Sequence, residues 1–379
     1  MSSWPQSVAD RQPVPQLDLL AQYAAIGGEI REALNRVLAS QHFVLGQEGA
    51  ALETEIAALC GVRHAIGVAS GTDALILALR AAGVASGDEV ILPPFTFVAT
   101  GSAVSALGAK PLFADIDPAT FNISAAEIAK RITPRTRAIL AVHLYGLAAD
   151  MDPIRELAAR HGLPVVEDNA QAIGATYKDR PTGSLGDMAC ISFYPTKNLG
   201  AYGDAGMIVT DRAQLDARLR ILRNHGQTTR YHSVEPGWNS RVDEVQAAVL
   251  RVKLRYLKER ERARRSHAAR YSQLLAGVGP VETPYIPADA RHVFHQYTIR
   301  AAQRDELQKF LADRKIGNAV YYPVPLHLQP LYAELGHQRG DFPAAEEAAA
   351  EVLSLPMFPE LRVEQIERVA ATIAEFYGR

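Results

Sequence analysis

Residues 64–83, HAIGVASGTDALILALRAAG, decide the fold class of this chain. The first part, HAIGVAS, is short and apolar, as in a strand, and TDALILALRAAG places apolar residues at helical spacing. Ser-Gly-Thr stands at the junction, where glycine lets a ligand approach the backbone and the first helical N–H groups lack partners. The stretch predicts a strand followed by a helix whose N-terminus is suited to bind an anion, although a plain serine N-cap explains the same residues.

The same alternation of strands and helices continues toward residue 168. EVILPP, KPLFADI, RAILAVHLYG and LPVVED have the strand pattern, and apolar residues recur at helical spacing between them. Short strands bounded by Gly, Pro or Asp favour a mostly parallel sheet with helices on both faces. Two short helices, at 26–38 and 52–59, are predicted before this region. Two strands, MACISFY and AGMIVT, and a helix at 215–223 are predicted after it.

The last third of the chain has a different pattern. One long helix is predicted from Val242 to Leu275, because no Gly or Pro interrupts it, and it is suited to link two domains. HQYTIR and AVYYPVPL have strand patterns, DELQKFLADR has a helical pattern, and two helices are predicted at the end. We therefore predict an α/β large domain, residues 16–254, and a smaller α+β domain, residues 255–379.

Composition and charge exclude several classes of function. A formal net charge of −2 and a pI of about 6.6 give no electrostatic reason to bind nucleic acid or an anionic membrane. The basic run Lys258–Arg265 is interrupted by Glu259 and Glu261 and predicts a solvated helix face. The two cysteines lack paired spacing, the polar N-terminal residues lack a signal pattern, and no apolar run reaches membrane-spanning length. We therefore expect a cytoplasmic protein.

One lysine differs from the other seven in its surroundings. Lys197 follows the apolar strand CISFY and precedes a Gly-rich segment, whereas the others lie where a solvated amine is expected. An amine desolvated in a cleft is the neutral nucleophile that forms a Schiff base, and an exposed loop lysine is the alternative. Asp168 ends the strand LPVVED and suits the acidic partner that pyridoxal phosphate needs at its ring nitrogen, a helix cap being the alternative.

Five further positions suit contacts to that cofactor. Gln171 has an amide donor for the phenolic oxygen, and Thr72 and Ser192 have hydroxyls that suit a phosphate site beside Gly71. Phe97 in PPFTFVAT suits stacking on a pyridine ring. Each residue also has a structural alternative, such as a turn hydrogen bond, a helix cap, a buried strand serine or a core phenylalanine.

Competing motifs are weak. The glycines of NLGAYGDAG do not form the dinucleotide fingerprint, and the chain has neither a phosphate-binding GxxxxGK[ST] loop nor a Gly-x-Ser-x-Gly elbow. His292 and His295 in HVFH have a spacing unsuited to one metal site, so we predict no metal.

Seven segments occur in one order: SGTDALILAL, PPFTFVAT, VHLYG, EDNAQAIGA, SFYPTKNLGAYGDAG, NHG and WNSRVDEVQAAVL. Over about residues 16 to 375 the chain resembles the DegT/DnrJ/EryC1/StrS family of sugar aminotransferases, which are fold-type-I pyridoxal-phosphate enzymes. A lysine at position 197 is typical of the family's aminotransferase branch, because the dehydratase branch has histidine at that position. Asn169 in EDNAQ departs from the family's usual alanine, and we expect it to face away from the cofactor without loss of activity.

The resemblance implies a role for each matched residue. Lys197 carries the cofactor and moves protons, and Asp168 pairs with the ring nitrogen. The implied cofactor contacts are Gly71, Thr72, Phe97, Gln171, Ser192 and Asn239, the last reaching in from the second subunit of a homodimer. Arg241 suits a carboxylate of either substrate or an ordinary interface contact. The remaining candidates for the sugar pocket, each with a structural alternative, are Arg230, Tyr231, Tyr321, Tyr322 and His327.

The resemblance also implies the reaction. L-Glutamate donates an amino group, and a nucleotide-linked keto-hexose accepts it. SGTDAL with VHLYG resembles the branch that aminates C3 rather than C4. Three alternatives stay open: C4 amination, another fold-type-I activity on amino acids, and a non-catalytic regulator that binds the cofactor.

Overall fold

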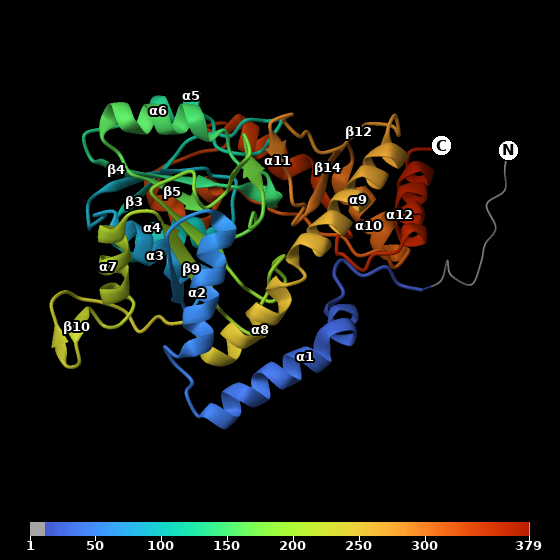
Figure 1. The fold of residues 1–379 in the computed structure, drawn as a ribbon. Coiled ribbons are helices and arrows are strands. Elements are labelled where there is room, and N and C mark those ends of the chain that lie inside the picture. Colours follow the sequence, from blue (N-terminus) through green and yellow to red (C-terminus); the bar gives the residue numbers. More distant parts are fainter. Residues whose placement is uncertain (1–11, 379) are drawn as a thin grey trace.

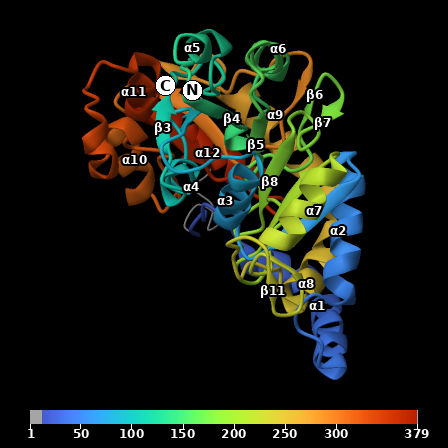
Figure 2. The same ribbon diagram turned by 90° about the vertical axis from the view of Figure 1, so that its left-hand side faces the viewer.

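A computed structural model describes residues 12–378 and confirms an α/β fold with a mostly parallel central sheet (Figures 1 and 2). The strand order is β1-β9-β8-β5-β4-β2-β3, with β9 antiparallel to both of its neighbours. The strands of this sheet, in that order, are His64–Val68, Gly206–Thr210, Met188–Ser192, Val165–Asp168, Thr136–Val142, Glu89–Leu92 and Lys110–Phe113.

Side chains along the strands alternate between two helix-covered faces. Val90 and Leu92 of β2 pack with α3, α4 and α7, whereas Ile91 packs with α5 and α6. Near β8 and β9 the second face is covered by α2 and α8. The helices on these faces are α2 (Gln47–Cys60), α3 (Gly71–Ala81), α4 (Val98–Ala106), α5 (Ala125–Ala129), α6 (Met151–His161), α7 (Ala213–Leu222) and α8 (Glu244–Leu254). Burial on both faces explains the nearly continuous apolar character of these strands.

The single long helix predicted over 242–275 is wrong. The chain forms α8 and then α9 (Leu257–Leu275), with a turn at Arg255 and Tyr256. The N–H of Tyr256 donates to the carbonyl of Lys253, three residues back, which tightens the chain into a turn and interrupts the α-helical ladder. Since neither glycine nor proline marks this break, the sequence pattern alone did not reveal it.

Two elements extend from the main body. Helix α1 (Leu19–Ser40) runs beside α8 and buries Ile26 and Ile30 against it (Figure 1). A hairpin of β10 (Gln227–Thr229) and β11 (His232–Ser233) projects away from the sheet (Figure 1).

The C-terminal region is α+β, but its strand at AVYYPVPL is wrong. Pro323 and Pro325 lack N–H donors, and only Ala319 forms an isolated bridge, to Ser354. The strand that pairs instead is β15, which the sequence pattern missed. The elements of this region are β12 (Val281–Glu282), β14 (Tyr297–Ala301), α10 (Arg304–Asp313), the 3₁₀ helices Leu326–Leu328 and Pro330–Leu335, α11 (Pro343–Glu351), β15 (Val352–Leu355) and α12 (Val363–Phe376).

Two apolar cores contain residues of the C-terminal region. The β12-β14-β15 sheet packs with α9, α10 and α12 around Tyr271 and Tyr297, whereas Leu326 and Phe342 join the core of the large sheet. A third, small sheet joins β13 (Ala290–Arg291), β6 (Thr176–Tyr177) and β7 (Arg180–Pro181). The division into residues 16–254 and 255–379 therefore stays a prediction.

The strand register brings the carboxyl ends of the parallel strands, among them β1 and β8, to one edge of the sheet. Ser192, at the end of β8, pairs with Gly206, which in turn pairs with Val68 at the end of β1. The parallel strands β2, β4 and β5 end at the same edge. In open α/β sheets ligands bind beyond the carboxyl ends of the strands, so this edge is where a site is expected. Within residues 12–378, no helix has the length and apolar character needed to cross a membrane.

Candidate active site

The N-terminus of α3 forms one wall of this edge. Ser70 caps the helix, and its hydroxyl accepts the N–H of Asp73 at 3.1 Å. A side chain at position 71 would collide with Ser192, because a Cβ there would lie 2.6 Å from the Ser192 Cβ. Glycine is therefore required where α3 meets β8. The structure thus brings Gly71, Thr72 and Ser192 together beside a helix N-terminus, which favours an anion.

Asp168 lies at the end of β5 and is held by a short chain of hydroxyl groups. It is buried, and its Oδ2 accepts the Thr100 hydroxyl at 2.8 Å. Thr100 in turn lies 3.0 Å from the Thr96 hydroxyl. Burial raises the pKa of Asp168, whereas the Thr100 hydroxyl, the N–H of Ala170 and the charge of Lys197 act to lower it. Sequence reasoning missed Thr100, although PPFTFVAT contains it, because nothing in the spacing named its partner.

Lys197 lies in the loop after β8, where its backbone N–H closes a turn onto the carbonyl of Tyr194 at 2.8 Å. The side chain is partly buried. Burial lowers the pKa of its amine to about 8, while the charge of Asp168 acts in the opposite direction. In the part of the chain that the structure describes, the amine makes no hydrogen bond or ion pair. A desolvated amine without a partner is suited to act as a nucleophile.

The amide of Asn198 and the imidazole of His295 lie next to Lys197, and the sequence predicted neither as part of the site. The Nδ2 of Asn198 donates to the carbonyl of Val293 at 3.2 Å, and its Oδ1 lies 3.3 Å from Nδ1 of His295. Burial and the charge of Lys197 hold the pKa of His295 well below its usual value, so this ring is neutral.

Gln171 presents an oriented donor. Its Oε1 accepts the backbone N–H of Tyr145 at 2.7 Å, which fixes the amide so that Nε2 points the other way, 3.0 Å from the Tyr322 hydroxyl. Gly146 makes this arrangement possible, because its φ is +102° and a Cβ there would lie 3.2 Å from the carbonyl oxygen of Gln171. The VHLYG motif thus has a structural purpose that the sequence did not show.

Phe97 caps α4 and is 53% exposed, so the sequence alternative of a core phenylalanine does not hold. The ring of Phe97 lies near that of Tyr322. The two ring centroids are 5.9 Å apart and the ring planes are inclined by 37°. Burial raises the pKa of Tyr322, so its hydroxyl is neutral. The exposed ring of Phe97 is therefore free to contact a planar ligand.

Behind Asp168, Glu167 holds the end of β5. Its carboxylate is fully buried and accepts the N–H groups of Gly183, Leu185 and Gly186 at 2.7 to 2.8 Å. The ring of His143 lies 2.8 Å away, and because its Nδ1 accepts the N–H of Ala149, its Nε2 donates to Glu167. Neither residue was predicted, although both lie in the motifs VHLYG and EDNAQ.

Asn239 and Arg241 lie on the outer side of α3. Asn239 is exposed, Arg241 donates to the side chain of Asn224 at 3.0 Å, and Ser240 between them donates to Asp73 at 2.6 Å.

The predicted sugar-pocket residues fall into separate places. Arg230 and Tyr231 form the tip of the projecting hairpin, and Tyr231 is 83% exposed. The Tyr321 carbonyl accepts the Tyr145 hydroxyl. His327 differs from expectation, because its side chain is buried and lies 3.0 Å from Glu346, which leaves it no surface for a sugar in this conformation.

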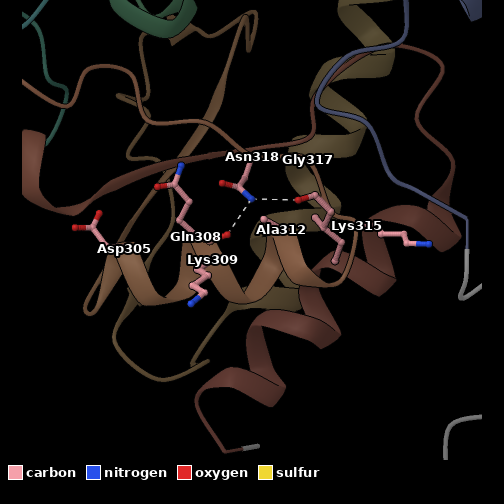
Figure 3. Close-up of a pocket in the computed structure, with 8 residues that line it drawn as sticks. Asp305, Gln308, Lys309, Ala312, Lys315, Gly317 and Asn318 are labelled. Carbon is pink, nitrogen blue, oxygen red and sulfur yellow. Dashed lines mark hydrogen bonds between the residues drawn. The ribbon is translucent and has the colours of Figure 1, made fainter.

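Cavity size does not locate this site. A shallow cavity of about 570 Å³ lies on the β12-β14-β15 side of the molecule, lined by α10 and the segment after it (Figure 3). Asn318 in its wall is bound to the carbonyls of Gln308 and Ile316 (Figure 3). None of the residues gathered around Lys197 lines this cavity.

Known proteins are similar to this chain in sequence and in overall fold. The model of the DegT/DnrJ/EryC1/StrS aminotransferase family matches residues 24–374. The chain belongs to this family. It is 52% identical to a pleiotropic regulatory protein of Geobacillus stearothermophilus, over 96% of the chain and 98% of that protein. It is 49% identical to a UDP-N-acetyl-3-dehydro-alpha-D-glucosamine 3-aminotransferase of Acidithiobacillus ferrooxidans, over 95% and 97%. DesV of S. venezuelae, solved in complex with a ketimine intermediate, is 46% identical and superposes with a TM-score of 0.95, over 97% and 99% of the two chains.

The residues of this DegT-family chain fit pyridoxal phosphate, the cofactor of the family. The fit rests on three separate features. The amine of Lys197 has no partner among residues 12–378, and the carboxylate of Asp168 is buried. The N-terminus of α3 packs against Ser192 so closely that only glycine fits at position 71. They match the aldehyde, the ring nitrogen and the phosphate of the cofactor in chemical type.

Proposed function

We propose that this protein transfers an amino group from L-glutamate to C3 of a nucleotide-linked keto-hexose and so makes an amino sugar. The observation that carries the proposal is the desolvated, unpartnered amine of Lys197 next to the buried carboxylate of Asp168. Two relatives described above support the substrate class, since one is a UDP-sugar 3-aminotransferase and the other was solved in complex with a ketimine intermediate.

The roles of the chain's own residues follow from their surroundings. When bound, pyridoxal phosphate supplies an electron sink that stabilises negative charge on the carbon next to the amine. Lys197 is the residue that would hold the aldehyde carbon of the cofactor, and its Nζ would accept and return a proton, for which a pKa of about 8 is well suited. Asp168 would face the ring nitrogen, and the Thr100 hydroxyl and the Ala170 N–H stabilise its charge against the burial that raises its pKa.

Orientation and phosphate binding are tasks of the remaining residues. Gln171 offers its Nε2 donor to a phenolic oxygen because its Oε1 is already bound to Tyr145. Phe97 offers an exposed ring face. Gly71, Thr72 and Ser192 present backbone and hydroxyl donors at the N-terminus of α3, where the helix dipole favours a phosphate.

We further propose that the working unit is a cytoplasmic homodimer with shared sites. Asn239 is exposed in the single chain and the hairpin bearing Arg230 and Tyr231 projects outward, so both are available to a second subunit. Large apolar side chains are exposed at the end of α1 and in the loop that follows it, and such patches mark contact surfaces. They are Leu38, Phe43, Val44 and Leu45.

A regulatory function is the second candidate, because the Geobacillus relative has a regulatory name. The cluster of Lys197, Asp168, Gln171 and Ser192 favours turnover, since a protein that only binds the cofactor does not need a proton-transferring amine.

The test uses the purified protein loaded with pyridoxal phosphate. We expect its visible absorbance band to change with L-glutamate and, in the reverse direction, with a nucleotide-linked 3-amino sugar but not with the 4-amino isomer. A response to the 4-amino sugar alone would reassign the position of amination. A band that no sugar alters would favour the regulatory candidate, and absence of any band would remove the role given to Lys197.

A further inference from the structure

A second cavity, of about 210 Å³, lies between α9, the end of α2 and β13, and charged side chains share its lining with Leu59, Pro181 and Leu257. It shares no residue with the site around Lys197. The polar residues that line it are Lys258, Glu261, Arg262 and Arg265 of α9 and Arg291 of β13, with Gly174 at its wall. The basic run of α9, which the sequence predicted to be a solvated helix face, therefore forms part of a concave surface, and Glu261 within it is buried.

The four cationic side chains of this cavity have no carboxylate partner. Among residues 12–378, none of Lys258, Arg262, Arg265 and Arg291 lies within ion-pairing distance of an acidic side chain. Arg291 donates to the carbonyl of Gly174 at 2.9 Å, and Arg262 donates to the carbonyl of Lys258 at 3.3 Å. Residues 258, 262 and 265 lie on one face of α9, so three like charges converge there beside the single carboxylate of Glu261. Such a cluster favours an anion.

Within residues 12–378, the carboxylate of Glu261, which lies among these positive charges, accepts no hydrogen bond. It is 6% exposed, and its buried Oε1 has no hydrogen-bond partner. Position 174 must be glycine to make room for it, because φ is +85° there and a Cβ would lie 1.7 Å from Oε1. Burial raises the pKa of Glu261 to about 7, although the charges of Arg291 and Arg265 act to lower it. A buried acceptor without a donor is unfavourable, so a ligand that brings a donor gains free energy here.

We propose that this cavity binds a small phosphate-bearing anion, with Lys258, Arg262, Arg265 and Arg291 around its charge and Glu261 accepting a hydrogen bond from its protonated oxygen or hydroxyl group. Guanidinium groups match phosphate oxygens in geometry and charge. Sulfate has the same size and charge as hydrogen phosphate but no proton, so Glu261 repels it. The cavity thereby distinguishes phosphate from sulfate.

The experiment is calorimetric titration of the full chain, saturated with pyridoxal phosphate, at pH 8.5. Inorganic phosphate is the probe, and cofactor saturation keeps it from the α3 site. We expect one saturable site per chain, with sulfate binding at least about tenfold more weakly, because an unmade hydrogen bond to a charged group costs about that factor. Glucose 1-phosphate serves as a second probe: tighter binding than inorganic phosphate assigns an ester as the ligand, and equal or weaker binding assigns the free ion.

Two variants test the roles of the side chains. Arg265→Gln should weaken phosphate binding about tenfold, whereas Arg255→Gln, which removes an exposed arginine paired with Glu29 outside the cavity, should leave it unchanged. Glu261→Gln supplies an amide donor, so it should bring sulfate affinity up to that of phosphate. Absence of saturable phosphate binding, or an Arg265→Gln affinity equal to wild type, would overturn the site. Equal wild-type affinities for phosphate and sulfate would overturn the role of Glu261.

Discussion

Lys197, which is partly buried, and Lys253, which is buried, have similar pKa values and different surroundings. Burial lowers the pKa of each amine to about 8. Lys253, on α8, donates to the carbonyl of Gly200 at 2.6 Å, and its Nζ lies 4.3 Å from the centroid of the Tyr202 ring. Lys197 has no such partner within the described chain and lies in the field of Asp168.

The difference shows that desolvation alone does not identify a nucleophile. Lys253 donates to the loop that carries Lys197, since Gly200 is only three residues further along the chain. Its N–H groups and its position are committed to that contact and to the ring of Tyr202. Lys197 has a similarly lowered pKa, but within residues 12–378 its amine makes no hydrogen bond or ion pair, and it lies in the field of Asp168. Lys253 therefore holds the loop, and Lys197 is the lysine that we propose to react.

The largest expected effect is that of Lys197→Ala. It removes both the covalent attachment and the proton carrier, so turnover should fall by about 10³-fold or more. Lys253→Met is the matched variant, and its turnover should stay within a few-fold of wild type. Single-turnover rates with L-glutamate, together with mass measurement of the borohydride-reduced protein, check both. A Lys253→Met chain that no longer attaches the cofactor would break the distinction between the two lysines.

Asp168→Asn should have the next largest effect. The amide cannot hold positive charge on the ring nitrogen, and turnover should fall by about 10²-fold on the scale typical of such electrostatic contacts. The charge of Asp168 raises the pKa of Lys197 but does not act on Lys253. In the variant, the pKa of the Lys197 amine should therefore fall further, and that of Lys253 should not change. Reductive methylation of the cofactor-free protein across pH 6 to 10 measures both amines, and a parallel change in both would contradict the assignment.

Thr100→Val tests the hydroxyl that stabilises Asp168. The variant removes a 2.8 Å hydrogen bond to a buried carboxylate, so the pKa of Asp168 should rise and turnover should fall about tenfold, as expected for one charge-assisted bond. Thr96→Val, one hydroxyl further away, should have a smaller effect and serves as the control. A Thr100→Val rate equal to wild type would show that the charge of Asp168 is maintained without this hydroxyl.

Much of the fold was predictable because it depends on patterns local to each element. The strands and helices from residue 64 to 210 have the expected periods, and the edge where Lys197, Asp168 and Ser192 meet follows from parallel pairing. The failures are non-local. The turn at Tyr256 has no sequence mark, and β15 forms because it pairs with β14 rather than because of its own composition.

The partners of the site residues were the least predictable part. Lys253 has the same kind of helical context as an exposed lysine, and only the approach of the Gly200 loop buries it. Thr100, Glu167 and His143 stood in quoted motifs, but their roles depend on contacts with residues that lie 16 or more positions away. Asn169 is a related case, because both polar atoms of its buried side chain lack partners among the described residues, a cost that composition does not reveal.

The smallest expected effect concerns stability against pH in the Lys253→Met variant. The pKa of Lys253 is about 8 in the folded chain, below the value of about 10.4 for an unfolded lysine. Between these values the unfolded chain binds more protons than the folded one, so this lysine makes wild-type stability rise with pH, and its desolvation cost is largest below pH 8. Methionine lacks this dependence. The wild-type advantage over Lys253→Met should therefore grow by about 1 to 2 kcal/mol from pH 7.5 to 9.5.

Urea unfolding at the two pH values measures this change in the free energy of unfolding. Lys309→Met, which replaces an exposed lysine, is the control, and its difference from wild type should be constant. A constant difference for Lys253→Met as well would mean that the carbonyl of Gly200 fully offsets the desolvation of the amine, and the two lysines would then differ in their pKa as well as in their partners.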